Sequence, residues 1–387
     1  NDANAILTIV KEQISSMQNQ FVSNPLSLLM TRNMASLKTS NNYESYLYGL
    51  EYFGFLTKLE QLMQSEPGVV LAELEAIHQL ILNRTNLTTL FAGSEASIEK
   101  HETEIKKFIE ALPVNPIASQ DYTKIPLPAH KEGIAMDTPV QYNMISADYE
   151  AMGTTFSGKY VPIGLVISEN YITPKIRFEN GAYDSIASFG NNSFMLISYR
   201  DPNINETFEV FKGLPDFIRN LTITQEELDR YILKAFSSYT AAEGELSGAM
   251  STMSNYLVGR TTEDRLEILQ EIKSATVQDL KDSAAMFESF LTNGAWSTVG
   301  SVDKIEASKA LYDSVISFGQ QSSEPVTRAQ FFELILAGVP EPVSVAKQMG
   351  LFLGDGAGNY FEDEKLTMEQ LAVILDRLAV LNGVQLG

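Results

Sequence analysis

The chain has no cysteine among its 387 residues and only three histidines, His78, His101 and His130. Without cysteine it can form neither a disulfide nor a thiolate nucleophile. A zinc hydrolase site needs histidines one helical turn apart with a nearby carboxylate, and no histidine here has a second one at that spacing. His101 begins the run HETEIKK, in which position 105 is isoleucine. The sequence therefore predicts that this chain binds no metal itself.

Positive charge is also scarce, because 28 lysines and arginines face 49 aspartates and glutamates, for a formal net charge of -21. Phosphate backbones are bound by clustered lysine and arginine. The sequence has no basic run, which excludes nucleic acid as a partner. The acidic balance has two interpretations: a chamber that attracts basic peptides, or simply a soluble, colloidally stable surface. The second is the simpler.

No apolar run reaches the ~20 residues that a membrane-spanning helix needs. The first residues, NDANAILTIVKEQ, lack a starting methionine, a basic segment and an apolar segment. No signal peptide is therefore expected, and the chain is expected to be a fragment. Its length and its 44% hydrophobic composition predict two or three globular domains.

Residues 1–118 are predicted to be mainly helical. Apolar residues recur at spacings of three and four in ILTIVKEQISSM, YLYGLEYFGFLTKLEQLM and VVLAELEAIHQLIL. The alternation in NLTTLFAG, from Asn86, predicts one strand, and helical spacing then resumes until Pro113 ends it. A proline-rich stretch from Val114 to His130 predicts an extended linker.

Residues 119–312 are predicted to form an α+β domain, an antiparallel sheet with packed helices. Strands are expected at PVQYNMISADY, YVPIGLVIS and FMLISYRD, with a strand or turn at KIRFENGAY. Two long helices are expected near FEVFKGLPDFIRNL and QEELDRYILKAFSSY, followed by a strand at AWSTVGS. The run VGRTTEDRLEIL predicts a capped helix start at Thr262 and Asp264.

The stretch from Lys175 to Asn220 carries the most specific signal. It contains Arg177, then Gly181, and then Tyr183 six positions after the arginine. A strand ending in SYRDP follows. This arrangement resembles the C-terminal half of the presequence-protease branch of the pitrilysin and insulinase family. Residues 1–310 follow that family's order of elements, with the first 112 matching only in general pattern.

The resemblance implies a non-catalytic half of a zinc metalloendopeptidase that degrades unstructured peptides. Zinc would be bound by an H-x-x-E-H motif in the missing N-terminal half of the same polypeptide, and this fragment would be inactive alone. Tyr183 would donate to the scissile carbonyl and Arg177 would bind substrate backbone, roles that suit a phenol and a planar guanidinium. From the residues alone, Arg177 is a surface charge and Tyr183 a half-buried strand residue.

Two neighbouring features have structural interpretations. Arg200 and Asp201, in SYRDP, are expected to form a local ion pair at a strand end, with a role in shaping the peptide site as the alternative. The run GDGAGNYFEDE, residues 354–364, contains acidic residues and glycines, but its spacing fails the EF-hand pattern of oxygen ligands.

Residues 319–387 resemble a single degenerate surface-layer homology module. VTRAQFFELILAG contains its TRA motif, and the second helix reads TMEQ, with Met368 in place of an arginine. The resemblance implies that Arg328 contacts an anionic cell-wall polymer, and packing of this small helical module against the peptidase half is the alternative. A bacterial origin and a cell-surface or extracellular location are expected over a cytoplasmic one.

A second function remains open. The chain could be a catalytically silent peptide-binding or cell-surface structural subunit that kept the fold without the chemistry. The two functions differ in whether a zinc-binding half precedes this chain in the same polypeptide.

Overall fold

The computed structural model describes residues 2–116, 125–190, 192–318, 342–348, 351 and 360. By its internal contacts the chain forms two compact units, Asn1–Gly319 and Gln320–Gly387. Helix α16 (Pro342–Gln348) is the described element of the second unit. Within the described ranges, no helix combines the length and apolar character that crossing a bilayer would require.

The first unit begins with helices and continues with a sheet and further helices. The N-terminal helices are α1 (Ala3–Ser23), α2 (Pro25–Ala35), α3 (Thr39–Tyr48), α4 (Leu50–Ser65), α5 (Pro67–Ile81), the 3-10 turn η1 (Arg84–Asn86) and α6 (Glu95–Ala111). The later helices are α7 (Tyr160–Ile167), the π-helix η3 (Ser168–Glu179), α8 (Asn205–Lys212), α9 (Leu214–Asn220), α10 (Gln225–Tyr239), α11 (Glu245–Leu257), α12 (Thr262–Lys273), α13 (Val277–Asn293), α14 (Val302–Ala307) and η4 (Lys309–Leu311).

The sheet has six strands in the order β3-β4-β2-β5-β1-β6. They are β1 (Lys131–Met136), β2 (Gln141–Asp148), β3 (Asp184–Phe189), β4 (Ser193–Asp201), β5 (Ala295–Ser301) and β6 (Ser314–Ser317). Strands β2, β3 and β4 pair antiparallel, and β5 joins β2 antiparallel, but β1 runs parallel to both β5 and β6. The α+β class is confirmed, with a mixed rather than purely antiparallel sheet.

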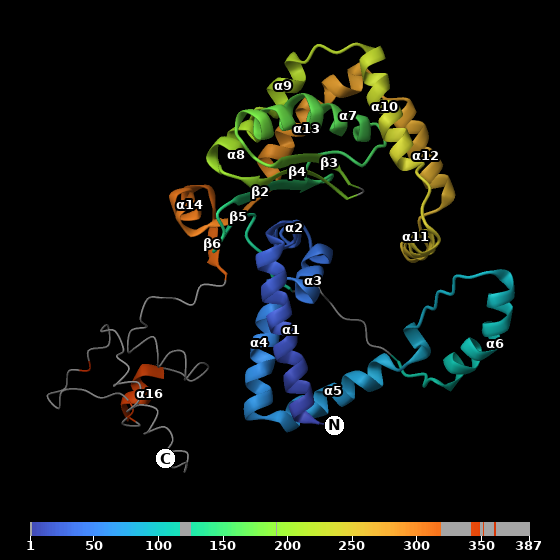
Figure 1. Cartoon of the computed structure of the whole chain (residues 1–387), viewed down its shortest axis with the longest axis vertical. Coiled ribbons are helices and arrows are strands. Elements are labelled where there is room, and N and C mark those ends of the chain that lie inside the picture. Colours follow the sequence, from blue (N-terminus) through green and yellow to red (C-terminus); the bar gives the residue numbers. More distant parts are fainter. Residues whose placement is uncertain are drawn as a thin grey trace. The chain divides into compact units, whose positions relative to one another are not determined.

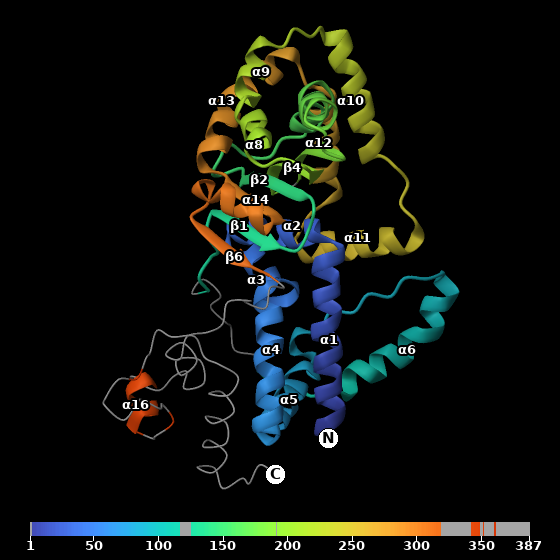
Figure 2. The same cartoon turned by 60° about the vertical axis from the view of Figure 1, so that its left-hand side comes forward.

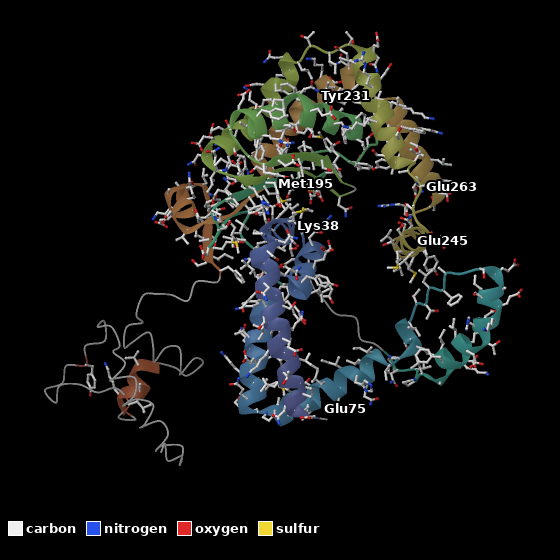
Figure 3. All side chains as sticks on the ribbon, in the orientation of Figure 1. Lys38, Glu75, Met195, Tyr231, Glu245 and Glu263 are labelled. Atoms are coloured by element: carbon white, nitrogen blue, oxygen red, sulfur yellow. The ribbon has the colours of Figure 1, made fainter. Side chains whose placement is uncertain are left out.

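Helices cover one face of the sheet as a layer that includes α7, α8, α9, α10 and α13 (Figure 1). The core beneath them contains fully buried Phe194, Phe287 and Phe290, whose rings contact one another edge to face. Burying side chains of this size contributes about 1.5–3 kcal/mol each. Figure 3 shows Tyr231 of α10 in this layer and Met195 of β4 on the sheet beneath it.

The N-terminal helices cover part of the other face, where α2 lies against β2 and β5 (Figure 2). Leu28 and Leu29 of α2 share a second core with Met144 of β2 and Val299 of β5. The predicted boundary at residue 118 stays a prediction, and the two segments that it separates share this apolar core.

Polar contacts also join the N-terminal helices to the sheet. The guanidinium of Arg32 donates to both carboxylate oxygens of Glu132 in β1, at 3.0 Å for Nη2 to Oε1. Buried Asn33 donates from Nδ2 to the carbonyl of Ala295 at 3.0 Å and to the hydroxyl of Ser297 at 2.9 Å, and it accepts from the hydroxyl of Ser146. Helix α2 is therefore held to the sheet by buried and partly buried hydrogen bonds.

Capping boxes begin helices α10, α12 and α13. The threonine before each helix accepts from a backbone N–H three residues on, and the acidic side chain there accepts from the threonine N–H. The predicted start near Thr262 is confirmed, but the capping side chain is that of Thr261, because Thr262 already has helical backbone geometry.

The strand expected at YVPIGLVIS is wrong, because residues 160–179 form α7 and η3. Its β-branched residues favour a strand locally. Buried Ile163, Val166 and Ile167, however, stand at helical spacing, and Ile172 and Ile176 extend the same stripe under the helical layer. Burial of that stripe outweighs the local preference.

The strand predicted at NLTTLFAG is also absent, since residues 87–92 take no regular structure in the described chain. A strand needs a neighbouring strand to satisfy its backbone groups, and the described residues offer this segment none.

The helices predicted around it are confirmed as α1, α4, α5 and α6, and the strand at AWSTVGS is confirmed as β5. The helix expected near FEVFKGLPDFIRNL is divided into α8 and α9 at Gly213, two residues before Pro215.

Asn33→Ala is expected to lower the free energy of unfolding by about 2–4 kcal/mol, because it leaves buried partners on β2 and β5 without a hydrogen bond. Urea unfolding of this chain measures the change. The matched control is Asn19→Ala on the exposed face of α1, which should change stability by less than about 0.5 kcal/mol. Equal changes in the free energy of unfolding for the two substitutions would contradict the conclusion that Asn33 holds α2 to the sheet.

Candidate functional site

Arg177 and Tyr183 lie on either side of the turn that joins η3 to β3. The π-helix carries Arg177 in its last turn and is closed by Asn180, whose N–H donates to the Lys175 carbonyl. Gly181 follows with a φ of 83°, in the left-handed region that glycine enters without a steric penalty. The predicted turn at Gly181 is confirmed. It reverses the chain so that Tyr183 leads into the sheet.

A β-bulge in the neighbouring strands fixes the backbone of Tyr183. Gln141 pairs with Asp201 and Asn143 with Ser198, so Tyr199 and Arg200 together oppose the single residue Tyr142. The carbonyls of both bulge residues accept from the Tyr183 N–H, at 3.1 Å from Tyr199 and 3.3 Å from Arg200. The start of the edge strand is thereby tied to the bulge.

Beneath the bulge lies a buried hydrogen-bond network centred on Asp201, which is fully inaccessible to solvent. Its carboxylate accepts from the hydroxyl of Thr207 at 2.6 Å, from the N–H of Asn203 at 2.8 Å and from the side chain of Asn143 at 3.4 Å. Asn203 in turn donates from Nδ2 to the carbonyl of Asn180 at 2.8 Å. The network therefore connects the bulge to the turn between Arg177 and Tyr183.

The Tyr183 side chain points away from the core, with 64% of the residue exposed. Its ring meets that of Tyr199 edge to face, with 6.0 Å between the centroids. Arg177 is about half exposed, its guanidinium carbon lies 5.7 Å from the ring centroid of Phe178, and its Nη1 is 4.0 Å from the Asp184 carboxylate. A phenol and a guanidinium are therefore exposed beside a sheet edge, where both can donate hydrogen bonds to a ligand.

Arg200 and Asp201 do not form the ion pair expected from the sequence. Asp201 is buried among its hydrogen-bond donors, whereas Arg200 is exposed and lies over the Tyr199 ring, with 5.4 Å from the guanidinium carbon to the centroid. The hydrogen bond to Tyr142 raises the pKa of Arg200. Burial raises the pKa of the Tyr142 phenol, so it stays neutral. The bulge separates the two neighbouring side chains.

The described residues contain no group of three or more histidine, aspartate or glutamate side chains placed to hold a metal ion. His78 and His101 are exposed on α5 and α6, far apart along the chain, and the carbonyl of His130 accepts from the Trp296 N–H.

Two predictions fall outside the described residues. Arg328, the expected wall-polymer contact, is one of them, and most of the run 354–364 with the failed calcium pattern is the other. The surface-layer resemblance of residues 319–387 stays a prediction.

Residues 131–302 match the family model described as the PreP C-terminal domain. The match covers this chain from strand β1 through strand β5. The resemblance to the C-terminal half of a pitrilysin-like peptidase is confirmed. The matched range includes both strands of the bulge and the turn that carries Arg177 and Tyr183.

Curated relatives extend the similarity beyond that domain. Protein HypA of Clostridium perfringens is 23% identical over 318 residues, which is 82% of this chain and 32% of the relative. Presequence protease 1 of Arabidopsis thaliana, chloroplastic/mitochondrial, is 26% identical over 300 residues, or 77% of this chain and 28% of the relative. The chain therefore spans about a third or less of the length of these relatives.

Solved structures show the same fold. Pitrilysin superposes with a TM-score of 0.53 at 14% identity, covering 82% of this chain and 34% of that chain. The peptidase M16 inactive domain from Pseudomonas fluorescens gives a TM-score of 0.50 at 14% identity, covering 78% of this chain and 71% of that chain. At such low identity these matches support the pitrilysin-like α+β fold and nothing finer.

Asp201 is expected to make stability depend on pH. Burial raises the pKa of its carboxyl above the usual value of 3.8. The folded state then holds the proton more tightly than the unfolded state. The stability contributed by Asp201 is therefore greatest below its unfolded pKa and is lost as the pH rises through the folded pKa. Asn at this position carries no such titration, so the free energy of unfolding of the wild type minus that of Asp201→Asn should fall with rising pH.

Urea unfolding at a series of pH values from about 3 to about 7 measures this difference. Thr207→Val serves as a companion variant, because the Thr207 hydroxyl lowers the pKa of Asp201 and its loss should move the fall to higher pH. A difference between wild type and Asp201→Asn that stays constant or rises with pH would contradict the assignment.

Proposed function

We propose that this chain is the non-catalytic C-terminal half of a zinc metalloendopeptidase that cleaves unstructured peptides. The observation that carries the proposal is the exposed pair Arg177 and Tyr183, held at one sheet edge by a buried network within the matched domain. The match of residues 131–302 to the PreP C-terminal domain model supports a peptidase, and the likeness to the peptidase M16 inactive domain supports a half without its own metal site.

In this proposal Tyr183 donates its phenolic proton to the oxygen of the scissile carbonyl as negative charge develops there. A donor held ~2.7–3.1 Å from the oxyanion stabilises the transition state without further reorganisation. Its ring is supported by Tyr199 and its backbone by two bulge carbonyls, which limits the positions it can take. Arg177 offers several N–H donors in one plane and holds a peptide carbonyl beside it.

Zinc, bound by the N-terminal half, supplies the activated water. The residues of this chain fit that division, because the described part offers donors for substrate but no metal-ligand group. The partner of this chain is accordingly the N-terminal catalytic half of the same polypeptide, and its ligand is an extended peptide that reaches across both halves.

The alternative is a catalytically silent peptide-binding or cell-surface subunit. The exposed donors at Arg177 and Tyr183 suit peptide binding without cleavage as well. An H-x-x-E-H motif encoded upstream in the same polypeptide favours the peptidase, and its absence favours the silent subunit. We also propose a cell-surface location and a wall-polymer contact through Arg328, and both are compatible with either function.

Tyr183→Phe, made in the native polypeptide that contains this chain, is expected to lower kcat for an unstructured fluorogenic peptide about 10²-fold, because it removes one transition-state donor. KM should change little. The control is Tyr256→Phe, which alters an exposed phenol of α11 and should leave kcat within about twofold.

Unchanged turnover of Tyr183→Phe in a polypeptide that does cleave the peptide would rule out the proposed role of the phenol. Binding of the peptide to a polypeptide that never cleaves it, with zinc present, would instead support the silent subunit.

A further inference from the structure

Arg200 has a backbone conformation that its residue type disfavours. Its φ is 49°, and no other non-glycine residue in the described ranges has a positive φ. Bulges with a residue in this left-handed region usually place glycine there, because a Cβ is sterically penalised. An arginine kept at such a position is a strained residue, and strained residues concentrate where a side chain acts on a ligand.

The Arg200 side chain is also a cation without an acidic partner. It is exposed, and no carboxylate of the described chain lies within ion-pair distance of it. Its neighbour Asp201 is turned into the core and is fully used by other donors. The chain has a net charge of -21, and yet this arginine beside the candidate site is not paired with an acid of the described chain. Its guanidinium N–H groups can therefore donate to a ligand.

Two tyrosines hold the guanidinium in place instead. It lies over the Tyr199 ring, and the Tyr142 ring meets the Tyr199 ring edge to face, with 5.4 Å between the centroids. The other side of this cluster is Tyr183, whose ring also meets Tyr199 and whose N–H donates to the Arg200 carbonyl. A side chain oriented by packing loses less freedom when it binds a ligand. Arg200 is therefore positioned beside the residue proposed to contact the scissile bond.

We propose that Arg200 binds a carboxylate of the peptide and so determines specificity at the site that contains Tyr183. The inference rests on the proposed function. A planar guanidinium matches a carboxylate in two parallel hydrogen bonds. The carboxylate comes either from an acidic side chain of the peptide or from its C-terminus, because both present the same two oxygens.

The test uses the native polypeptide and three unstructured fluorogenic peptides of otherwise identical sequence. One has a glutamate close to the cleaved bond and a free C-terminus, one has glutamine in place of that glutamate, and one keeps the glutamate but has an amidated C-terminus. The variants are Arg200→Gly and Arg200→Gln, and Arg230→Gln on exposed α10 is the control.

Arg200→Gly separates binding from folding. Glycine relieves the left-handed backbone conformation, so the Tm should stay the same or rise while the guanidinium is lost. Both Arg200 variants are expected to raise KM for the first peptide about 10-fold or more, as expected for loss of a charge-assisted hydrogen bond. The control should leave KM unchanged for all three peptides.

The peptide arms identify the source of the carboxylate. If the side chain supplies it, the glutamine peptide should show no change in KM on mutation of Arg200. If the C-terminus supplies it, the amidated peptide should show none. An equal effect of Arg200→Gly on all three peptides, no effect on any of them, or a Tm well below that of the wild type would overturn the inference.

The proposed function has a separate readout. Tyr183→Phe should lower kcat for all three peptides alike. If it does so while the Arg200 variants leave every KM unchanged, the inference about Arg200 fails and the peptidase role of this half stands. If neither residue affects cleavage, the proposed function fails as well.

Discussion

The β-bulge at Tyr199 and Arg200 is the constraint on which the candidate site depends. By setting two residues of β4 against the single Tyr142 of β2, it supplies the carbonyls that bind the Tyr183 N–H and turns Arg200 outward and Asp201 inward. The carboxylate of Asp201 then organises the loop that supports the turn at Gly181. A local irregularity in one pair of strands thus determines where several side chains of the site lie.

The sheet that carries the bulge is buried on both faces, which makes the site part of a stiff body. Phe194 faces the helical layer, while Met144 and Val299 face the N-terminal helices. Asn33 and Arg32 add polar contacts that fix α2 against β5 and β1. Any motion of the site would therefore carry this body as a whole rather than rearrange its strands, because close-packed interiors resist continuous deformation.

Local sequence signals predicted much of this fold. Helical spacing predicted α1, α4, α5 and α6, the run VGRTTEDRLEIL predicted the start of α12, and Gly181 indicated the turn before β3. The helix at 160–179 was missed because β-branched residues favour strands, although Ile163, Val166 and Ile167 already had helical spacing. The exposure of Arg200 could not be predicted, since the bulge depends on pairing with Tyr142, which lies far away in the sequence.

The sheet order has a consequence for synthesis on the ribosome. Strand β5 lies between β2 and β1, yet it begins at Ala295, about 160 residues after β1 ends at Met136. At ~5–20 residues per second, roughly 8–30 s pass before it can emerge. Throughout that interval the facing edges of β1 and β2 lack the strand that joins them, with Ile134, Met144 and Ile145 awaiting burial. Until β5 has been made, these unpaired strand edges are therefore a site at which the nascent chain can aggregate.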